Sequence, residues 1–181
     1  MKKFLAAAFA SAFMAFSPTA QAQTPPNVLV GGQIAEPKSL DPQAVTAVND
    51  FRILMNIYDG LVRYKDGTLE VEPALAKSWT ISDDGKTYTF KLREGVAFHD
   101  GTPFNAEAVK ANIDRSQNLP ESRRKSEVKS IAGVEVTGPY QVKFTLKAPD
   151  ATLLAQFADR SGMMLSPTAA AAAGADLGAN P

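Results

Sequence analysis

The sequence predicts a mixed α/β fold, an α+β lobe in which amphipathic helices alternate with β-hairpins and pack on a mixed sheet. Between residues 79 and 92, apolar and polar residues alternate on both sides of an Asp-Asp-Gly turn, as expected for a hairpin with one buried face. Residues 140–146 alternate in the same way. In residues 49–61, apolar side chains instead recur at helical spacing, which indicates an amphipathic helix.

The N-terminus has the pattern of a cleavable signal peptide. Lys2 and Lys3 precede a thirteen-residue apolar region, 4–16, and the small residues of an Ala-Gln-Ala triplet end at Ala22. A bilayer span needs about 20 apolar residues, so this region is too short to cross a membrane. We therefore predict a signal peptide over residues 1–22, with a membrane anchor as the alternative.

The chain has no cysteine, and this absence bears on stability and localisation. No disulfide can form, so stability must come from a packed core, and no lipid can be attached to an N-terminal cysteine. We expect a protein that is soluble in the periplasm and is not a lipoprotein. Without Lys2 and Lys3, 19 − 2 = 17 basic residues face 19 acidic residues, a net charge near −2. This balance argues against nucleic acid as a partner.

The first elements follow in chain order. Residues 28–30 read as a buried strand, and residues 36–43, which contain two prolines, read as a loop. The helix over 49–61 ends near Gly60. Residues 61–71 form a further predicted hairpin around Lys65-Asp66-Gly67.

Beyond the hairpin of residues 79–92, Asn105 is expected to cap a helix that runs to about residue 117. Residues 119–127 are polar and are expected to form an exposed loop. The basic run at 123–125 is expected to be a solvated surface, with an anion-binding patch as the alternative. A third hairpin is predicted over 131–146.

Two short helices are predicted to follow. Asp150 is expected to cap the first, which carries Leu153, Leu154 and Phe157. Ser166-Pro167 reads as an N-cap followed by a proline at the first helical position.

No arrangement of catalytic groups is convincing. His99, the single histidine, precedes Asp100 and is expected to be a turn residue, with a catalytic base as the alternative. Asp83 and Asp84 lie in a predicted turn, where aspartate is favoured for its backbone hydrogen bonds. We therefore expect no catalytic residue, no metal site and no cofactor. Binding is the function that remains, and these patterns do not name the ligand.

Three blocks carry a resemblance to a known family. The first is Ser-Leu-Asp-Pro at 39–42 with the Tyr-Asp-Gly-Leu at 58–61, and the second is the string over 73–104. The third is the hairpin over 134–146 with Ser-Pro at 166–167. In this order they resemble the extracytoplasmic solute-binding proteins of family 5, the dipeptide-, oligopeptide- or nickel-binding components of ABC importers.

The resemblance implies a type II periplasmic binding protein fold, in which two lobes close over a ligand. After the signal peptide, residues 23–47 would begin lobe I, 48–160 would form a peripheral subdomain and 161–181 would return to lobe I. The second lobe would lie beyond residue 181, so we expect this chain to be the N-terminal part of a longer protein. One lobe alone is expected to bind weakly or not at all.

The resemblance also points to ligand-binding residues. Thr46, Ala47 and Val48 would hydrogen-bond an extended ligand through their backbones. Arg160 would pair with a ligand carboxylate, and Met163 would line an adaptable pocket. The alternatives are a plain loop-to-helix junction at 46–48 and an ion pair between Arg160 and a neighbouring acid such as Asp159.

The implied function is capture of di- or oligopeptides and their delivery to an ABC permease complex in the inner membrane. Binding of nickel, another metal chelate or glutathione is the alternative, and a secreted hydrolase or accessory module is a remote one. The protein is expected to be a monomer. Specificity would depend largely on the second lobe.

Overall fold

The computed structural model describes residues 25–28, 30–32 and 34–179, and the predicted signal peptide lies outside them. The chain divides into two units, Met1–Gly32 and Gln33–Pro181. In the first, the described residues 25–28 form a turn closed by a hydrogen bond from Val28 N to Pro25 O (2.9 Å). The predicted buried strand at 28–30 is wrong for residues 28 and 30, and residue 29 lies outside the described residues. Val28 and Val30 are exposed, and no described strand pairs with them to satisfy a ladder.

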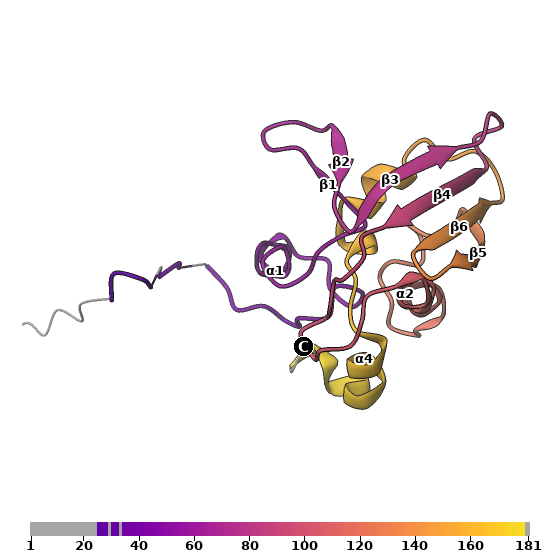
Figure 1. Ribbon diagram of the computed structural model, residues 1–181. Coiled ribbons are helices and arrows are strands. Elements are labelled where there is room, and N and C mark those ends of the chain that lie inside the picture. The colour runs from indigo at the N-terminus through magenta and orange to yellow at the C-terminus, as the bar shows by residue number, and fades with distance from the viewer. Residues whose placement is uncertain (1–24, 29, 33, 180–181) are drawn as a thin grey trace, which may run out of the picture. The chain divides into compact units, whose positions relative to one another are not determined.

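The second unit contains a four-stranded sheet with the order β3-β4-β6-β5 (Figure 1). Every described pairing in it is antiparallel, so the expected mixed sheet is wrong for this part of the chain. The β3–β4 and β5–β6 hairpins lie side by side because β4 pairs with β6. A separate antiparallel pair, β1–β2, forms the predicted hairpin around residues 65–67. The strands are β1 (Val62–Tyr64), β2 (Val71–Pro73), β3 (Ala76–Ile81), β4 (Thr87–Leu92), β5 (Ile131–Gly138) and β6 (Gln141–Leu146).

Two of the predicted helix caps are confirmed. The Asn105 side chain accepts a hydrogen bond from Ala108 N (2.9 Å), and the Ser166 side chain accepts one from Ala169 N (3.1 Å). Asp150 is not the N-cap of its helix. It lies two residues before Thr152, the N-cap, and accepts hydrogen bonds from that residue. The helices are α1 (Val48–Leu54), α2 (Ala106–Asn118), α3 (Leu153–Phe157), α4 (Pro167–Ala173) and the 3-10 turns η1 (Arg160–Gly162) and η2 (Gly174–Gly178).

Helix α1 is shorter than predicted, because it ends at Leu54 and a turn follows. The chain then forms an isolated bridge between Gly60 and Met163, which draws residues 58–61 out of the helical path. A Cβ on Gly60 would lie 2.8 Å from the carbonyl oxygen of Val62, so only glycine fits this close approach. A tertiary contact therefore sets the end of the helix.

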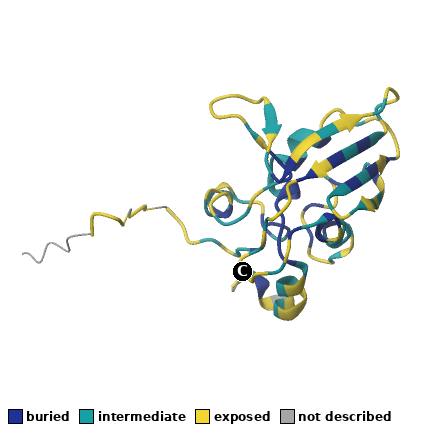
Figure 2. Cartoon of the chain, in the orientation of Figure 1, coloured by how far each residue is buried: buried dark blue, intermediate teal, exposed yellow. Residues whose placement is uncertain are grey.

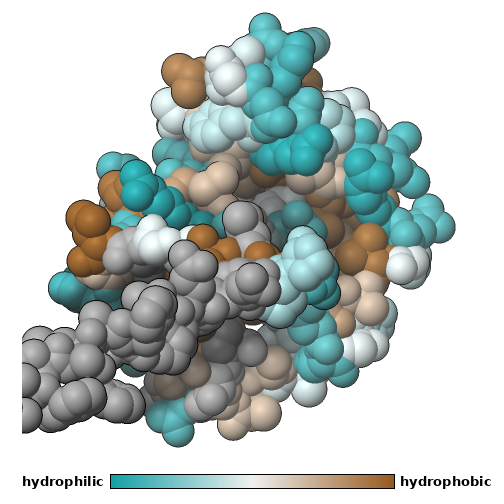
Figure 3. Space-filling view, turned by 90° about the vertical axis from the view of Figure 1, so that its left-hand side faces the viewer, coloured by the Kyte–Doolittle hydropathy of each residue, from teal (hydrophilic) through white to brown (hydrophobic). Residues whose placement is uncertain are grey.

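The core lies where the sheet meets α2 and α3, and buried residues alternate with less buried ones along β4 and β6 (Figure 2). Phe90, Phe144 and Phe157 form its centre, with ring centroids 5.3–6.0 Å apart. Tyr88 is buried and Trp79 packs partly buried against this cluster, which confirms that the hairpin aromatics belong to the core. On the face shown in Figure 3, hydrophobic residues form separate patches among hydrophilic ones.

We expect Phe90→Ala to lower the free energy of unfolding by about 3–5 kcal/mol, because the ring is fully buried against two other phenylalanines and its loss leaves a cavity. Equilibrium urea unfolding measures the change. Leu69→Ala is the control, since Leu69 is 86% exposed, and it should change stability by less than about 0.5 kcal/mol. Equal losses in the two variants would contradict this view of the core.

Candidate functional site

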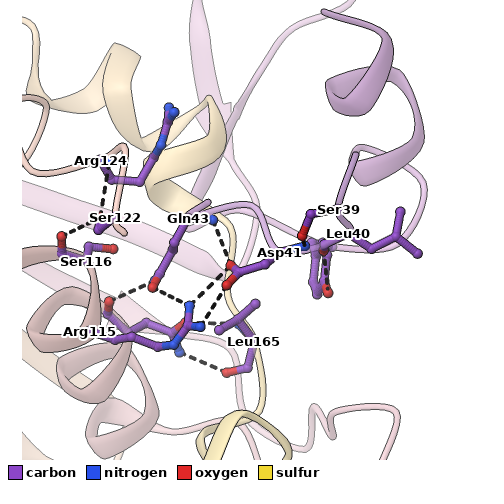
Figure 4. A network of polar contacts seen from close by, with 11 residues as sticks. Ser39, Leu40, Asp41, Gln43, Arg115, Ser116, Ser122, Arg124 and Leu165 are labelled. Atoms are coloured by element: carbon purple, nitrogen blue, oxygen red, sulfur yellow. Dashed lines mark hydrogen bonds and ion pairs between the residues drawn. The ribbon is translucent and has the colours of Figure 1, made fainter. Parts of the chain in front are cut away.

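The loop that precedes α1 is held by a buried polar network (Figure 4). Arg115, on α2, donates from Nη2 to Asp41 Oδ2 (2.7 Å) and from Nη1 to Asp41 Oδ1 (3.2 Å). It also donates to the side-chain oxygen of Gln43, whose amide group in turn donates to Asn112 O (3.1 Å). The Asp41 and Gln43 side chains thus add to the few backbone hydrogen bonds that hold this irregular loop.

The same helix also holds the segment before α4. Asn112 donates from Nδ2 to Leu165 O (2.8 Å), and its Oδ1 accepts a hydrogen bond from Leu165 N (3.0 Å). Asn112 and Arg115 are three residues apart on α2 and so share one face. The sequence showed these residues only as polar positions in a predicted helix, and no local pattern indicated their partners.

Arg124 forms a second anchor, and here the prediction was wrong. The loop over 119–127 was expected to be exposed and its basic run solvated, yet Arg124 is only 1% exposed and Ser122 is also buried. The Arg124 guanidinium donates to Val45 O (2.8 Å) and to Glu127 Oε1 (2.6 Å), and Ser161 donates to the other oxygen of Glu127. The local composition predicted that the Arg124 charge is exposed to solvent. It is instead buried against the carbonyl of Val45, 79 residues away in the chain.

The predicted ligand-binding residues lie next to these anchors. Arg160 donates from Nη1 to Thr46 O (2.7 Å), so the structure brings these two candidates into contact. The alternative pairing is present as well, because Arg160 Nε donates to Asp159 Oδ1 (3.0 Å). The guanidinium carbon lies 5.1 Å from the centre of the Phe51 ring, within reach of a cation–π interaction.

Met163 is buried with Val45 and Leu54 in a small apolar cluster. Thr46 and Val48 are exposed, and Ala47 is the N-cap of α1. Within the described part of the chain, no protein acceptor is found for the backbone N–H groups of residues 46–48. These donors are therefore available to a ligand, whereas Met163 contributes mainly to packing. The ligand roles of all five residues remain predictions.

His99 and Asp100 lie in a turn, as the sequence predicted. Asp100 accepts hydrogen bonds from Thr102 and from the hydroxyl of Ser166, the N-cap of α4. The bond from Ser166, and then those from Thr102, hold the pKa of Asp100 below its usual value. His99 is exposed, and no hydrogen bond between His99 and Asp100 is found in the described structure.

Two further observations concern the described residues as a set. They contain no cluster of three or more His, Cys, Asp or Glu side chains arranged to hold a metal ion. None of their helices has the length and apolar character needed to cross a membrane.

Comparison with known proteins identifies the class. The chain belongs to the bacterial extracellular solute-binding proteins of family 5, whose middle region matches residues 70–181. The fold is accordingly that of part of a periplasmic binding protein, as the sequence predicted.

Individual relatives differ in their ligands. The glutathione-binding protein GsiB of Shigella flexneri is 40% identical over 144 residues, which cover 79% of this chain and 28% of the relative. The periplasmic binding protein DppA of Helicobacter pylori, solved with the peptide STSA, is 32% identical with a TM-score of 0.70, over 80% of this chain and 32% of that one. NikA of Brucella suis, solved with Fe(III)-EDTA, is 41% identical with a TM-score of 0.63, over 72% and 26%. The chain thus spans 28% of the curated relative's length.

We expect Arg124→Met to lower the free energy of unfolding by about 3 kcal/mol, because it leaves Glu127 and the Val45 carbonyl without their buried partner. Arg123→Met, at the exposed neighbouring position, removes the same charge and should cost less than about 0.5 kcal/mol. Urea unfolding of the two variants side by side provides the measurement. Similar stability of both would show that Arg124 is no anchor.

Tyr58 provides a pH-dependent test of the same loop. Its hydroxyl donates to Leu40 O (3.1 Å), and burial, followed by the charge of Asp41, raises the pKa of Tyr58 from 10.0 to about 12. The folded-state pKa is above the unfolded value, so the contribution of Tyr58 to stability is complete below about pH 10 and is lost as the pH rises toward 12.

In a spectrophotometric titration of the folded protein, we therefore expect one tyrosine to ionise near pH 12 and Tyr58→Phe to remove that step. If Tyr58→Phe instead removes a step near pH 10, the pKa of Tyr58 is not raised, and the loop does not enclose its hydroxyl as described.

Proposed function

We propose that the protein is the substrate-binding component of an ABC importer, which captures di- or oligopeptides between two lobes in the periplasm. It then delivers them to a permease complex in the inner membrane and acts as a monomer. Family membership and the peptide complex of DppA support this proposal. The observation that carries it is that the backbone N–H groups of residues 46–48, held beside Arg160 by two buried anchors, find no acceptor among the described residues.

The geometry suits an extended ligand. A peptide laid along residues 46–48 offers backbone carbonyl oxygens to their N–H groups, as in recognition by strand addition. Arg160 already uses Nε and Nη1, and its Nη2 has no partner among the described residues, which leaves donors for a ligand carboxylate. In this proposal the site binds and orients its ligand without a catalytic step.

The same proposal divides the chain between lobe I and a peripheral subdomain. Residues 23–47 and 161–181 would belong to lobe I, and residues 48–160 to the peripheral subdomain. In this division, the hydrogen bonds from Asn112 to Leu165 and from Arg124 to Val45 would join the subdomain to both lobe I segments. A clamp gains its affinity from both lobes, so binding measurements need the full-length protein.

Two other ligand classes have specific support. Glutathione is favoured by the 40% identity to GsiB, and a metal chelate by the 41% identity to NikA. Native mass spectrometry of the full-length protein, purified from the periplasm, separates the three classes by the mass of the ligand that copurifies. Recovery of a covalent reaction product would contradict the binding function.

We expect Arg160→Gln to weaken the binding of short peptides by about tenfold or more, because a charge-assisted hydrogen bond is lost and Thr46 O loses its donor. Isothermal titration calorimetry with the full-length protein measures the affinity. Arg63→Gln on β1, where the side chain is 69% exposed, is the matched control and should bind as the wild type does. Unchanged affinity in Arg160→Gln would remove Arg160 from the site.

A further inference from the structure

A cavity of about 400 Å³ lies next to the candidate ligand-binding residues, between α1 and the loop that precedes it. Thr46 and Ala47 line it, together with Lys38, Asp50 and Arg123. This volume lies within the range of roughly 300–1,000 Å³ that small-molecule sites occupy. The cavity therefore adjoins the N–H donors described above and adds charged groups to them.

Asp50 is the unusual member of this lining. The residue is only 1% exposed, and its Oδ1 accepts hydrogen bonds from Lys38 N (3.1 Å) and Asn49 Nδ2 (3.4 Å). Its Oδ2 is buried and has no hydrogen-bond partner among the described residues. A buried carboxylate oxygen without a partner is costly, and the terminal torsion of aspartate is broad enough to turn that oxygen toward a donor in the cavity.

The other charges of the cavity have the opposite sign. Lys38 and Arg123 are exposed, and within the described part of the chain neither takes part in an ion pair. An anion alone would meet the Asp50 carboxylate, and a metal ion would find too few oxygen ligands. A group with an ammonium next to a carboxylate satisfies both signs at once.

We propose that this cavity binds an α-amino-acid headgroup, with the ammonium on Asp50 and the carboxylate facing Lys38 and Arg123. The inference rests on the proposed importer function, and within it favours glutathione, the alternative ligand named there, over di- and oligopeptides. The γ-glutamyl end of glutathione has this chemistry, because its α-ammonium and α-carboxylate are on the same carbon. A linear peptide lacks it, since the carbon that bears its terminal ammonium carries an amide.

The test compares two ligands on the full-length protein by isothermal titration calorimetry. One is glutathione, and the other is its deaminated analogue, in which hydrogen replaces the α-ammonium. The wild type should prefer glutathione by about tenfold or more, the effect of a charge-assisted hydrogen bond. Asp50→Asn should weaken glutathione binding and leave the affinities for the two ligands within about twofold of each other.

Asp66→Asn is the matched control, because Asp66 lies exposed in the β1–β2 turn, and it should keep the wild-type preference. A variant Asp50→Asn that loses affinity for both ligands equally would make Asp50 a purely structural residue and overturn the proposal. Unchanged preference in that variant would overturn it too.

Trialanine, as a third ligand, separates this inference from the proposed function. Binding of trialanine but not glutathione by the wild type would leave peptide capture standing and refute the headgroup site. Binding of neither would count against both.

Discussion

The placement of the candidate site depends on the ion pair between Asp41 and Arg115. Residues 39–46 contain no helix or strand, and side chains position them together with backbone hydrogen bonds such as that from Arg123 N to Gln43 O (2.8 Å). Both oxygens of Asp41 accept from one guanidinium, a geometry that offsets much of the cost of taking the two charges out of water. Gln43 and Asn112 extend the bonding to Leu165, so that one helix holds two segments far apart in the chain.

Two further arginines constrain the end of this loop. Arg124 donates to the carbonyl of Val45, and Arg160 donates to the carbonyl of Thr46. With both carbonyls engaged, the backbone cannot turn freely, and the N–H groups that follow keep one orientation. Such preorganisation lowers the ordering cost of binding.

Much of the fold could be predicted because its causes are local. Alternation identified the hairpins, and the capping residues Asn105 and Ser166 identified the starts of two helices. The strand at residues 28–30 could not be predicted correctly, since a strand needs a partner, and the described residues supply none. The early end of α1 was missed for a related reason, as the bridge from Gly60 to Met163 competes with helix continuation.

By itself, the sequence determined the family, the hairpins, the aromatic core and the segments in which to look for a site. It could do so because side-chain period and turn chemistry act over a few residues. Only the tertiary structure decided the fate of individual charges. Arg124 is buried while Arg123 beside it is exposed, and one buried oxygen of Asp50 has no hydrogen-bond partner among the described residues. The energy of a charge depends on its distance to partners and to water, and contacts between distant segments set both.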